Sequence, residues 1–233
     1  MSTVNRRHFM FASSGAVAGA IVVPGLLEAD ETTPGQFAQS GWATGQPKPL
    51  KHKEIPCFLS AAQIAPHHTA HYGGALKAVL AADAKLEEST KSGTAVDPAA
   101  FAHLKRTINS RGNSVILHEF YFDGLSPKAA DPHPELRAAI EQRFGSMEKW
   151  SADFIASAKE AAGWTMLVKH PVNGKLYNVV SDEHAMGVLW MAAPLIVIDT
   201  YEHAFYIDYQ NRKAEYIEKF MSHIDWETAN RRG

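Results

Sequence analysis

Hydrophobic positions in the first half of the chain recur every three or four residues, which is the spacing of one face of a helix. The first such stretch opens at Ser60, with Gln63 in the spacing of a capping box, and it stops before the polar segment 89–97. The second opens at Pro98, a residue that is favoured in the first turn of a helix, and runs to Phe122. We expect the two stretches to form a long α-helical hairpin.

The pattern changes in the second half of the chain. The elements expected there are two short helices, two strands, a third strand and a helical tail, at residues 136–144, 147–161, 163–170, 175–181, 194–198 and 201–220. The sequence Val172-Asn173-Gly174 between the first two strands is typical of a tight hairpin turn. We therefore predict an α+β fold. An N-terminal long α-hairpin is followed by a C-terminal lobe with a three-stranded antiparallel sheet and surrounding helices.

The first residues of the chain resemble an export signal rather than a part of the fold. Asn5-Arg6-Arg7-His8-Phe9-Met10 precedes a weakly apolar run from 11 to 27, which is similar to a twin-arginine signal. A membrane anchor is the alternative, but Pro24 and Gly25 interrupt the apolar run. We expect a periplasmic or extracellular protein that meets the membrane only through this signal. The predicted divisions are a signal, a linker with an extended lead-in, a helical hairpin lobe and an α/β lobe, at 1–29, 30–54, 55–127 and 128–233.

Composition narrows the possible partners and ligands. The formal net charge is −2 over 233 residues, so no large basic surface for nucleic acid is implied. Twelve histidines stand against a single cysteine, Cys57, which has no internal partner for a disulfide. A metal site in this chain would therefore use nitrogen and oxygen ligands.

Four polar residues stand where the pattern predicts core. His67 begins a His-rich helical turn that also holds His71, and His118 lies in the apolar run 115–122. An unsatisfied imidazole in such a run would cost about 1–3 kcal/mol. Asp199 closes an apolar strand, and His203 follows it by four residues. Each histidine alone is equally compatible with a hydrogen-bonded core residue, whereas a buried carboxylate is usually paired or bound to metal. Three imidazoles and one carboxylate suit iron or manganese, and they also suit zinc.

Three longer segments make the chain resemble the iron/manganese superoxide dismutases from about residue 53 to 226. Residues 199–206 are similar to the family sequence D-x-W-E-H-A-[YF]-Y, with Tyr201 in place of Trp. Residues 163–168 resemble G-W-x-W-L, with Met166 at the second Trp, and residues 209–226 resemble the closing pattern Y-x-N…Y…N-W-x.

The resemblance implies both a ligand set and an activity. One iron or manganese ion per subunit would lie between the lobes, held by His67, His118, Asp199 and His203. Cycling of this metal between +3 and +2 would convert superoxide to oxygen and hydrogen peroxide. Two rival hypotheses remain: an exported dismutase-like metal-binding protein with weak or no activity, and a zinc hydrolase.

The resemblance also implies roles for residues around the four ligands. His184 would hydrogen-bond to the water on the metal. Ser114, one helical turn before His118, is small enough to leave room for the His184 side chain. A histidine at position 184 favours iron slightly over manganese. His184 in a polar turn could equally be a solvated residue. Trp164 and Phe122 would wall the pocket, or serve only as core.

The resemblance also implies a homodimer. Glu202 would bond to His203 of the partner subunit, and His71 to Tyr206 of the partner subunit. The alternative is that Glu202 is simply exposed on a helix.

Two positions depart from the family. Ala75 stands where the family has a Tyr at the entrance, and Lys213 stands where it has an Arg that attracts substrate. An ammonium still attracts superoxide at long range, but it lacks the fork of a guanidinium. We expect activity with altered proton delivery and a wider entrance.

Overall fold

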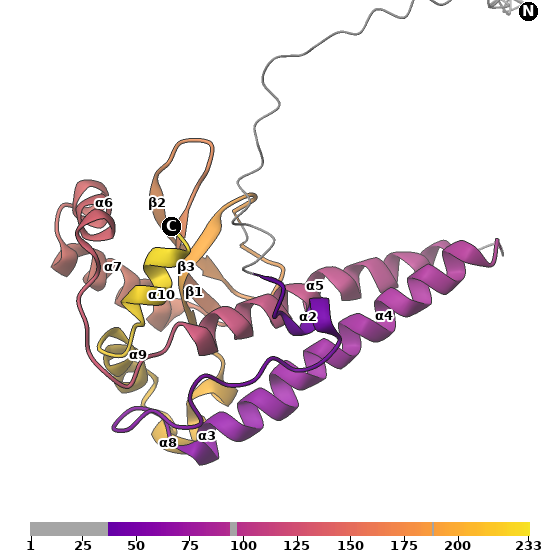
Figure 1. The fold of residues 1–233 in the computed structure, drawn as a ribbon, viewed down its shortest axis with the longest axis horizontal. Coiled ribbons are helices and arrows are strands. Elements are labelled where there is room, and N and C mark those ends of the chain that lie inside the picture. The colour runs from indigo at the N-terminus through magenta and orange to yellow at the C-terminus, as the bar shows by residue number, and fades with distance from the viewer. Residues whose placement is uncertain (1–36, 94–96, 188) are drawn as a thin grey trace, which may run out of the picture.

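The computed structural model describes residues 37–93, 97–187 and 189–233. A long helical hairpin extends from a lobe built around a small sheet, which confirms the predicted α+β class (Figure 1). The predicted signal at 1–29 lies outside the described residues. Within them, no helix combines the length and apolarity that a membrane span requires.

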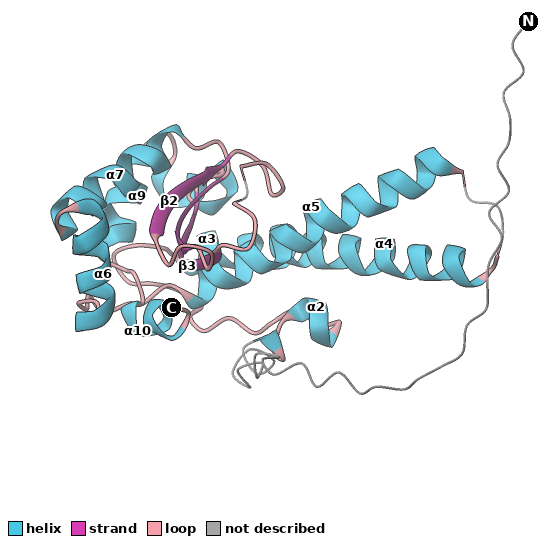
Figure 2. Ribbon diagram, turned by 90° about the horizontal axis from the view of Figure 1, so that it is seen from above, coloured by secondary structure: helices cyan, strands magenta, loops and turns pink. Residues whose placement is uncertain are grey.

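Four consecutive helical elements build the hairpin lobe: α3, the π-helix η1, α4 and α5, at Ala61–Pro66, His67–Tyr72, Gly73–Lys91 and Pro98–Asp123. Ser60 caps α3 by accepting from the Gln63 amide at 3.1 Å, and Asp97 caps α5 by accepting from the Ala100 amide at 2.8 Å. Figure 2 shows α4 and α5 side by side, projecting away from the sheet.

The π-helix was not predicted, and it contains both histidines that the sequence places one helical turn apart. Pro66 has no amide hydrogen for an α-helical bond, and the winding widens directly after it. Within η1, His67 is buried whereas His71 is exposed, and their ring centroids lie 6.3 Å apart.

The second lobe contains a sheet with strand order β2-β1-β3, all antiparallel. The strands β1, β2 and β3 are Trp164–Lys169, Leu176–Ser181 and Ala193–Asp199. Helices α6 and α7, Pro134–Phe144 and Met147–Glu160, precede them, and η2, α8, α9 and α10 follow, at Glu202–Ala204, Tyr206–Tyr209, Lys213–Met221 and Trp226–Arg231. The expected continuous helix over 201–220 is therefore wrong, because Gln210 has a positive φ of 52° that interrupts it.

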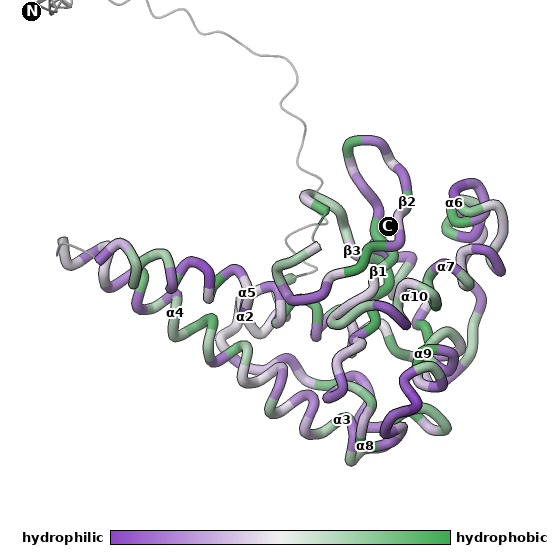
Figure 3. The backbone as a smooth tube through the Cα atoms, turned by 180° about the vertical axis from the view of Figure 1, so that it is seen from behind, coloured by the Kyte–Doolittle hydropathy of each residue, from purple (hydrophilic) through white to green (hydrophobic). Residues whose placement is uncertain are grey.

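A single core joins the lobes. Residues 195–199 of β3 are all buried, and α5 packs against this strand (Figure 3 shows the apolar colour on β1 and β3). Trp164 on β1 is paired with Asp199 on β3, so the register places an aromatic ring beside the end of the buried strand. Trp150 and Phe154 of α7 pack in the same core.

The expectation that residues 30–54 form only a linker and an extended lead-in is wrong for part of that segment. Helix α2, Gly41–Thr44, packs against α4 and α5. The carboxylate of Glu119 anchors it by accepting from the Gly41 amide at 2.8 Å and from the Ser40 hydroxyl at 3.2 Å. The Tyr72 hydroxyl donates to the same oxygen at 2.9 Å. A helix of four residues is too short to show periodicity in a sequence.

Gly112 permits the close contact between α5 and the Trp42 ring of α2, because an added Cβ would overlap that indole. We expect Gly112→Ala to lower the free energy of unfolding by about 1–3 kcal/mol. In a Trp42→Ala background the same change should raise it by up to about 1 kcal/mol, because alanine favours helix over glycine. Urea unfolding measures both values.

Gly74→Ala is the matched control, because an added Cβ there meets nothing within 4 Å. It should stabilise the protein slightly in both backgrounds. An equal effect of Gly112→Ala with and without Trp42 would contradict the proposed contact.

Candidate metal centre

The structure brings four side chains from both lobes to one point. His67 comes from η1, His118 from α5, Asp199 from the end of β3 and His203 from η2. One nitrogen or oxygen atom from each lies within 4.8 Å of all the others, and this is the one such group found among the described residues. His67, His118 and Asp199 are buried, and His203 is partly exposed.

Asp199 stands at the centre of this group. Its Oδ2 lies 3.1 Å from His67 Nε2, 3.2 Å from His203 Nε2 and 3.7 Å from His118 Nε2. Its Oδ1 accepts a hydrogen bond from the Tyr201 amide at 3.0 Å. One carboxylate oxygen is thus fixed by the backbone while the other faces three imidazoles.

His118 carries an unpaired nitrogen at the same point. Its Nδ1 lies 2.7 Å from the backbone oxygen of Ser114, which can only accept, so Nδ1 holds the proton. The lone pair of Nε2 then points toward Asp199, and this buried atom has no hydrogen-bond partner. A buried polar atom without a partner is costly, whereas a metal ion would satisfy it.

The protonation states of these side chains favour the binding of a cation. Burial opposes ionisation of Asp199, but hydrogen bonds from His203 and His67 hold its pKa well below the usual range. Burial lowers the pKa of His118 to about 3 and also lowers the pKa of His67. At neutral pH, His67 and His118 are therefore neutral and Asp199 is ionised. This set fits iron, manganese or zinc, and no thiolate competes because Cys57 is exposed elsewhere.

Side chains that sequence reasoning missed hold the ligands in place. Tyr216 donates from its hydroxyl to the backbone oxygen of Asp199 at 2.8 Å. Gln63, expected to close a capping box, donates instead to the backbone oxygen of His203 at 2.6 Å and accepts from the Ile207 amide. The Ser60 amide is bound by Asp208 at 2.7 Å. Ser60 does cap the helix through the Gln63 amide, as the spacing predicts. The Gln63 side chain, however, does not complete a capping box and links the two lobes instead.

His184 lies beside the four ligands. The indole Nε1 of Trp164 donates to His184 Nδ1 at 3.0 Å, and because an indole nitrogen only donates, the neutral His184 ring carries its proton on Nε2. The ring centroid lies 6.3 Å from that of His118 and 5.4 Å from that of Tyr201. Among the described residues no hydrogen bond engages this nitrogen, so it is available as a donor.

Aromatic rings surround the ligands. Trp164 meets the His118 ring edge-on at 5.0 Å, and Phe122 lies 4.8 Å from the His67 ring. Tyr201 stacks on His203 at 5.2 Å with an interplanar angle of 13°. The structure thus places both predicted wall residues at the site and adds Tyr201.

The residues predicted for a dimer lie on an open side of the centre. His71 is exposed and stacks on the His203 ring at 3.8 Å, and Glu202 and Tyr206 are also exposed. The latter two line a concavity of about 660 Å³ together with His203 and Lys213.

The structure also places Ala75 and Lys213, two residues that depart from the family pattern. Ala75 is buried at 3% exposure, so its methyl group lies in packed surroundings. Lys213 is held by backbone oxygens near the end of α7, since its Nζ donates to Ala161 at 2.6 Å and to Lys159 at 3.3 Å. Its ammonium group is therefore engaged and does not project freely.

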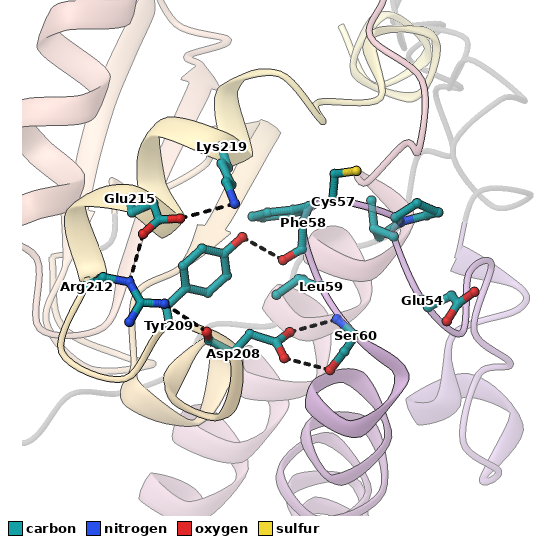
Figure 4. Close-up of a pocket in the computed structure, with 12 residues that line it drawn as sticks. Glu54, Cys57, Phe58, Leu59, Ser60, Asp208, Tyr209, Arg212, Glu215 and Lys219 are labelled. Carbon is teal, nitrogen blue, oxygen red and sulfur yellow. Dashed lines mark hydrogen bonds and ion pairs between the residues drawn. The ribbon is translucent and has the colours of Figure 1, made fainter.

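A second cavity, of about 500 Å³, lies away from the ligands (Figure 4). Within it, Asp208 accepts hydrogen bonds from the Ser60 amide and hydroxyl, and Glu215 lies between Arg212 and Lys219. Cys57 is on its rim, with a φ of 65°. This cavity holds none of the predicted ligands.

Comparisons with known proteins point to one family. Residues 132–232 match the family described as iron/manganese superoxide dismutases, C-terminal domain. The chain is 37% identical over 174 residues to superoxide dismutase [Fe] of Cupriavidus metallidurans, covering 73% of this chain and 86% of that protein. It is 31% identical over 182 residues to superoxide dismutase [Mn] 2 of Haloferax volcanii, covering 78% and 90%. It is 34% identical to superoxide dismutase [Fe] of Aquifex pyrophilus, covering 75% and 84%.

Burial of a neutral His118 predicts acid sensitivity of the metal-free protein. Its pKa is about 3 when folded and near 6.5 when unfolded, so the unfolded state binds more protons below pH 6.5. The free energy of unfolding should therefore fall as pH drops from 6.5 to 5, by up to about 1.4 kcal/mol per pH unit for this group. Asp199, with its lowered pKa, contributes no slope in this window.

Urea unfolding of the metal-free protein at several pH values measures this slope. His118→Gln is expected to reduce the slope, because the variant has no imidazole to protonate at that position. His103→Gln, on the exposed side of the same helix, should leave the slope unchanged. An identical slope in wild type and His118→Gln would show that His118 is not held neutral by burial.

Proposed function

The chain belongs to the iron/manganese superoxide dismutase family, and we propose that it acts as an exported homodimer that holds iron at His67, His118, Asp199 and His203. Family membership makes it a superoxide dismutase, which converts superoxide to oxygen and hydrogen peroxide. The observation that carries the ligand assignment is the convergence of three imidazoles and one carboxylate, with a buried His118 nitrogen that has no partner.

The residues around the ligands supply rigidity. His67, His118, Asp199 and His203 would hold the metal, which would supply one-electron redox chemistry toward superoxide. Ser114 fixes the His118 ring, the Tyr201 amide fixes Asp199, and Gln63 fixes the backbone of His203. Because these hydrogen bonds are formed before reaction, the ligand atoms need little rearrangement between oxidation states. The single carboxylate charge also offsets part of the cation charge.

His184 is the residue that we assign to proton control. Trp164 holds its Nδ1 as an acceptor, so the proton sits on Nε2, which can donate to solvent in the pocket. A donor beside the open side of a metal affects both the proton uptake that accompanies reduction and the reduction potential. The exposed fraction of His184 is intermediate, which leaves it in contact with solvent on one side.

Iron rather than manganese is our proposal for the metal. A histidine at position 184 favours iron in the family resemblance, and the relative from Cupriavidus metallidurans is named an iron enzyme. The relative from Haloferax volcanii is named a manganese enzyme, so the ligand residues themselves do not discriminate. The choice therefore rests on residues around the ligands.

The homodimer is proposed from the open side of the site. Glu202 and Tyr206 are exposed beside the ligand His203, and the neighbouring Ile207 is 56% exposed. A second copy covering this surface would bury apolar area and place a carboxylate near a ligating imidazole. The proposed contacts are Glu202 with His203 of the partner subunit and His71 with Tyr206 of the partner subunit.

Export by the twin-arginine route is proposed from the sequence Asn5-Arg6-Arg7-His8-Phe9-Met10 and the apolar run that follows it. This route is known for moving folded proteins, which suits a chain that receives its metal before export. The expected destination is the periplasm or the extracellular space.

One preparation tests these proposals together: the protein produced in its own host from the full sequence, with the predicted signal at its N-terminus, and isolated from that host. We expect it outside the cytoplasm, with close to one iron per subunit, the sedimentation of a dimer and the ability to consume superoxide. Cell fractionation, metal analysis, analytical ultracentrifugation and a superoxide assay give the four answers.

Each answer can contradict a separate proposal. A cytoplasmic protein would contradict export, manganese would contradict the metal assignment, and a monomer at micromolar concentration would contradict the dimer. Stoichiometric metal with no consumption of superoxide would leave only an exported metal-binding protein, and zinc with hydrolytic activity would favour the hydrolase.

His184→Ala tests the residue assigned to proton control. We expect a decrease in kcat of roughly ten- to a hundredfold, together with a changed reduction potential at unchanged metal content. His184→Gln should recover part of the rate, because an amide can still accept from Trp164 and donate onward. His103→Ala, an exposed histidine on α5, is the control. An unchanged potential in His184→Ala would contradict the role.

A further inference from the structure

The ligand His203 stands on weak local structure. It lies in η2, which has three residues, and the next helix, α8, has four; within the described part of the chain, neither is capped by the side chain of its own N-cap residue. Helices this short have little stability of their own. His203 is also the most exposed of the four ligand side chains, at 19%, whereas the others are at 1% or below. Its position must therefore be held from elsewhere in the fold.

The side chain of Gln63 spans the break between η2 and α8. Its Nε2 donates to the backbone oxygen of His203 at 2.6 Å, and its Oε1 accepts from the amide of Ile207 at 2.9 Å. A primary amide presents a donor and an acceptor at a fixed spacing, which matches a carbonyl at the end of one helix and an N–H group at the start of the next. Gln63 is fully buried, so water does not compete for either bond.

Gln63 belongs to the segment that carries another ligand. It lies in α3, which leads directly into η1, and His67 is the first residue of η1. The rings of His67 and His203 come from opposite lobes, and their centroids lie 4.9 Å apart. The Gln63 amide thus ties the backbone of one ligand to the helix that presents the other.

A second pair of hydrogen bonds joins the same two segments. The amide and the hydroxyl of Ser60 each donate to the carboxylate of Asp208 at 2.7 Å. This pair ends at Asp208 rather than at a ligand, and Asp208 is partly exposed. The two contacts therefore separate a bond to the ligand backbone from a bond that only holds the lobes together.

We propose that Gln63 is a positioning residue of the metal centre, which keeps His203 in register with His67 so that the metal is retained and its reduction potential is fixed. The proposal rests on the proposed ligand set, because Gln63 acts only through His203. Removing a group that orients a metal ligand typically changes metal affinity or activity by about 10- to 100-fold.

The test is the rate at which a chelator removes iron from the iron-loaded full chain, measured together with the reduction potential of the bound iron. Gln63→Met keeps the approximate volume of the side chain but loses both hydrogen bonds. We expect it to release iron about tenfold faster or more, with a shifted potential. Gln63→Asn has an amide that is one methylene group shorter and cannot span both partners. It should lie between wild type and Gln63→Met.

Asp208→Ala is the matched control, because it also removes two hydrogen bonds between the same segments. It should lower the midpoint of thermal unfolding but leave the release rate and the potential near their wild-type values. Gln63→Asn serves for both measurements if Gln63→Met does not fold.

Three results would overturn the inference: wild-type release and potential in the Gln63 variants, equal changes in Asp208→Ala, or faster release at an unchanged potential. The second would show that any contact between the segments suffices, and the third would indicate looser packing rather than positioning. A wild type that binds no iron, or a His203→Gln variant that releases iron at the wild-type rate, would instead overturn the ligand set, and the role of Gln63 with it.

Discussion

The buried carboxylate of Asp199 is the interaction on which the rest of the structure depends. It is fully buried at the end of β3, where an isolated negative charge would be very costly. Its cost is offset by the Tyr201 amide on one oxygen and by the imidazoles of His67 and His203 on the other. Because the imidazoles come from separate elements, the hairpin and the sheet lobe must meet at this point. The fold and the metal site are therefore one arrangement.

The same requirement explains the helical irregularities near the site. The π-helix η1 buries His67 while His71 stays at the surface, and Gln63 just before it reaches across to the backbone of His203. The short helix η2 in turn presents His203 to Asp199 from four residues away. Each irregular element costs some hydrogen-bond geometry, and each places a ligand or its support.

Three of the residues that differ from the family pattern are Ala75, Tyr201 and Lys213. Ala75 is buried and has no hydroxyl group, whereas Tyr201 has a phenol ring that stacks on His203. Lys213 donates to the backbone oxygens of Lys159 and Ala161 at the end of α7. The four side chains that could hold a metal thus converge although these surrounding positions differ from the family pattern.

The sequence by itself determined the features that are local in the chain: the positions of the hairpin helices and of three strands, through periodicity, and four candidate ligands, through polar residues in apolar runs. It also indicated the family through residues 199–206. Only the tertiary structure decided which groups meet. Gln63 donates to the backbone of His203, 140 residues away in sequence. Glu119 accepts from the Gly41 amide of α2, and Lys213 donates to the backbone oxygen of Ala161. The reason is physical: periodicity reports which face of an element is buried, whereas the partner of a polar side chain is set by packing between segments that are distant in sequence.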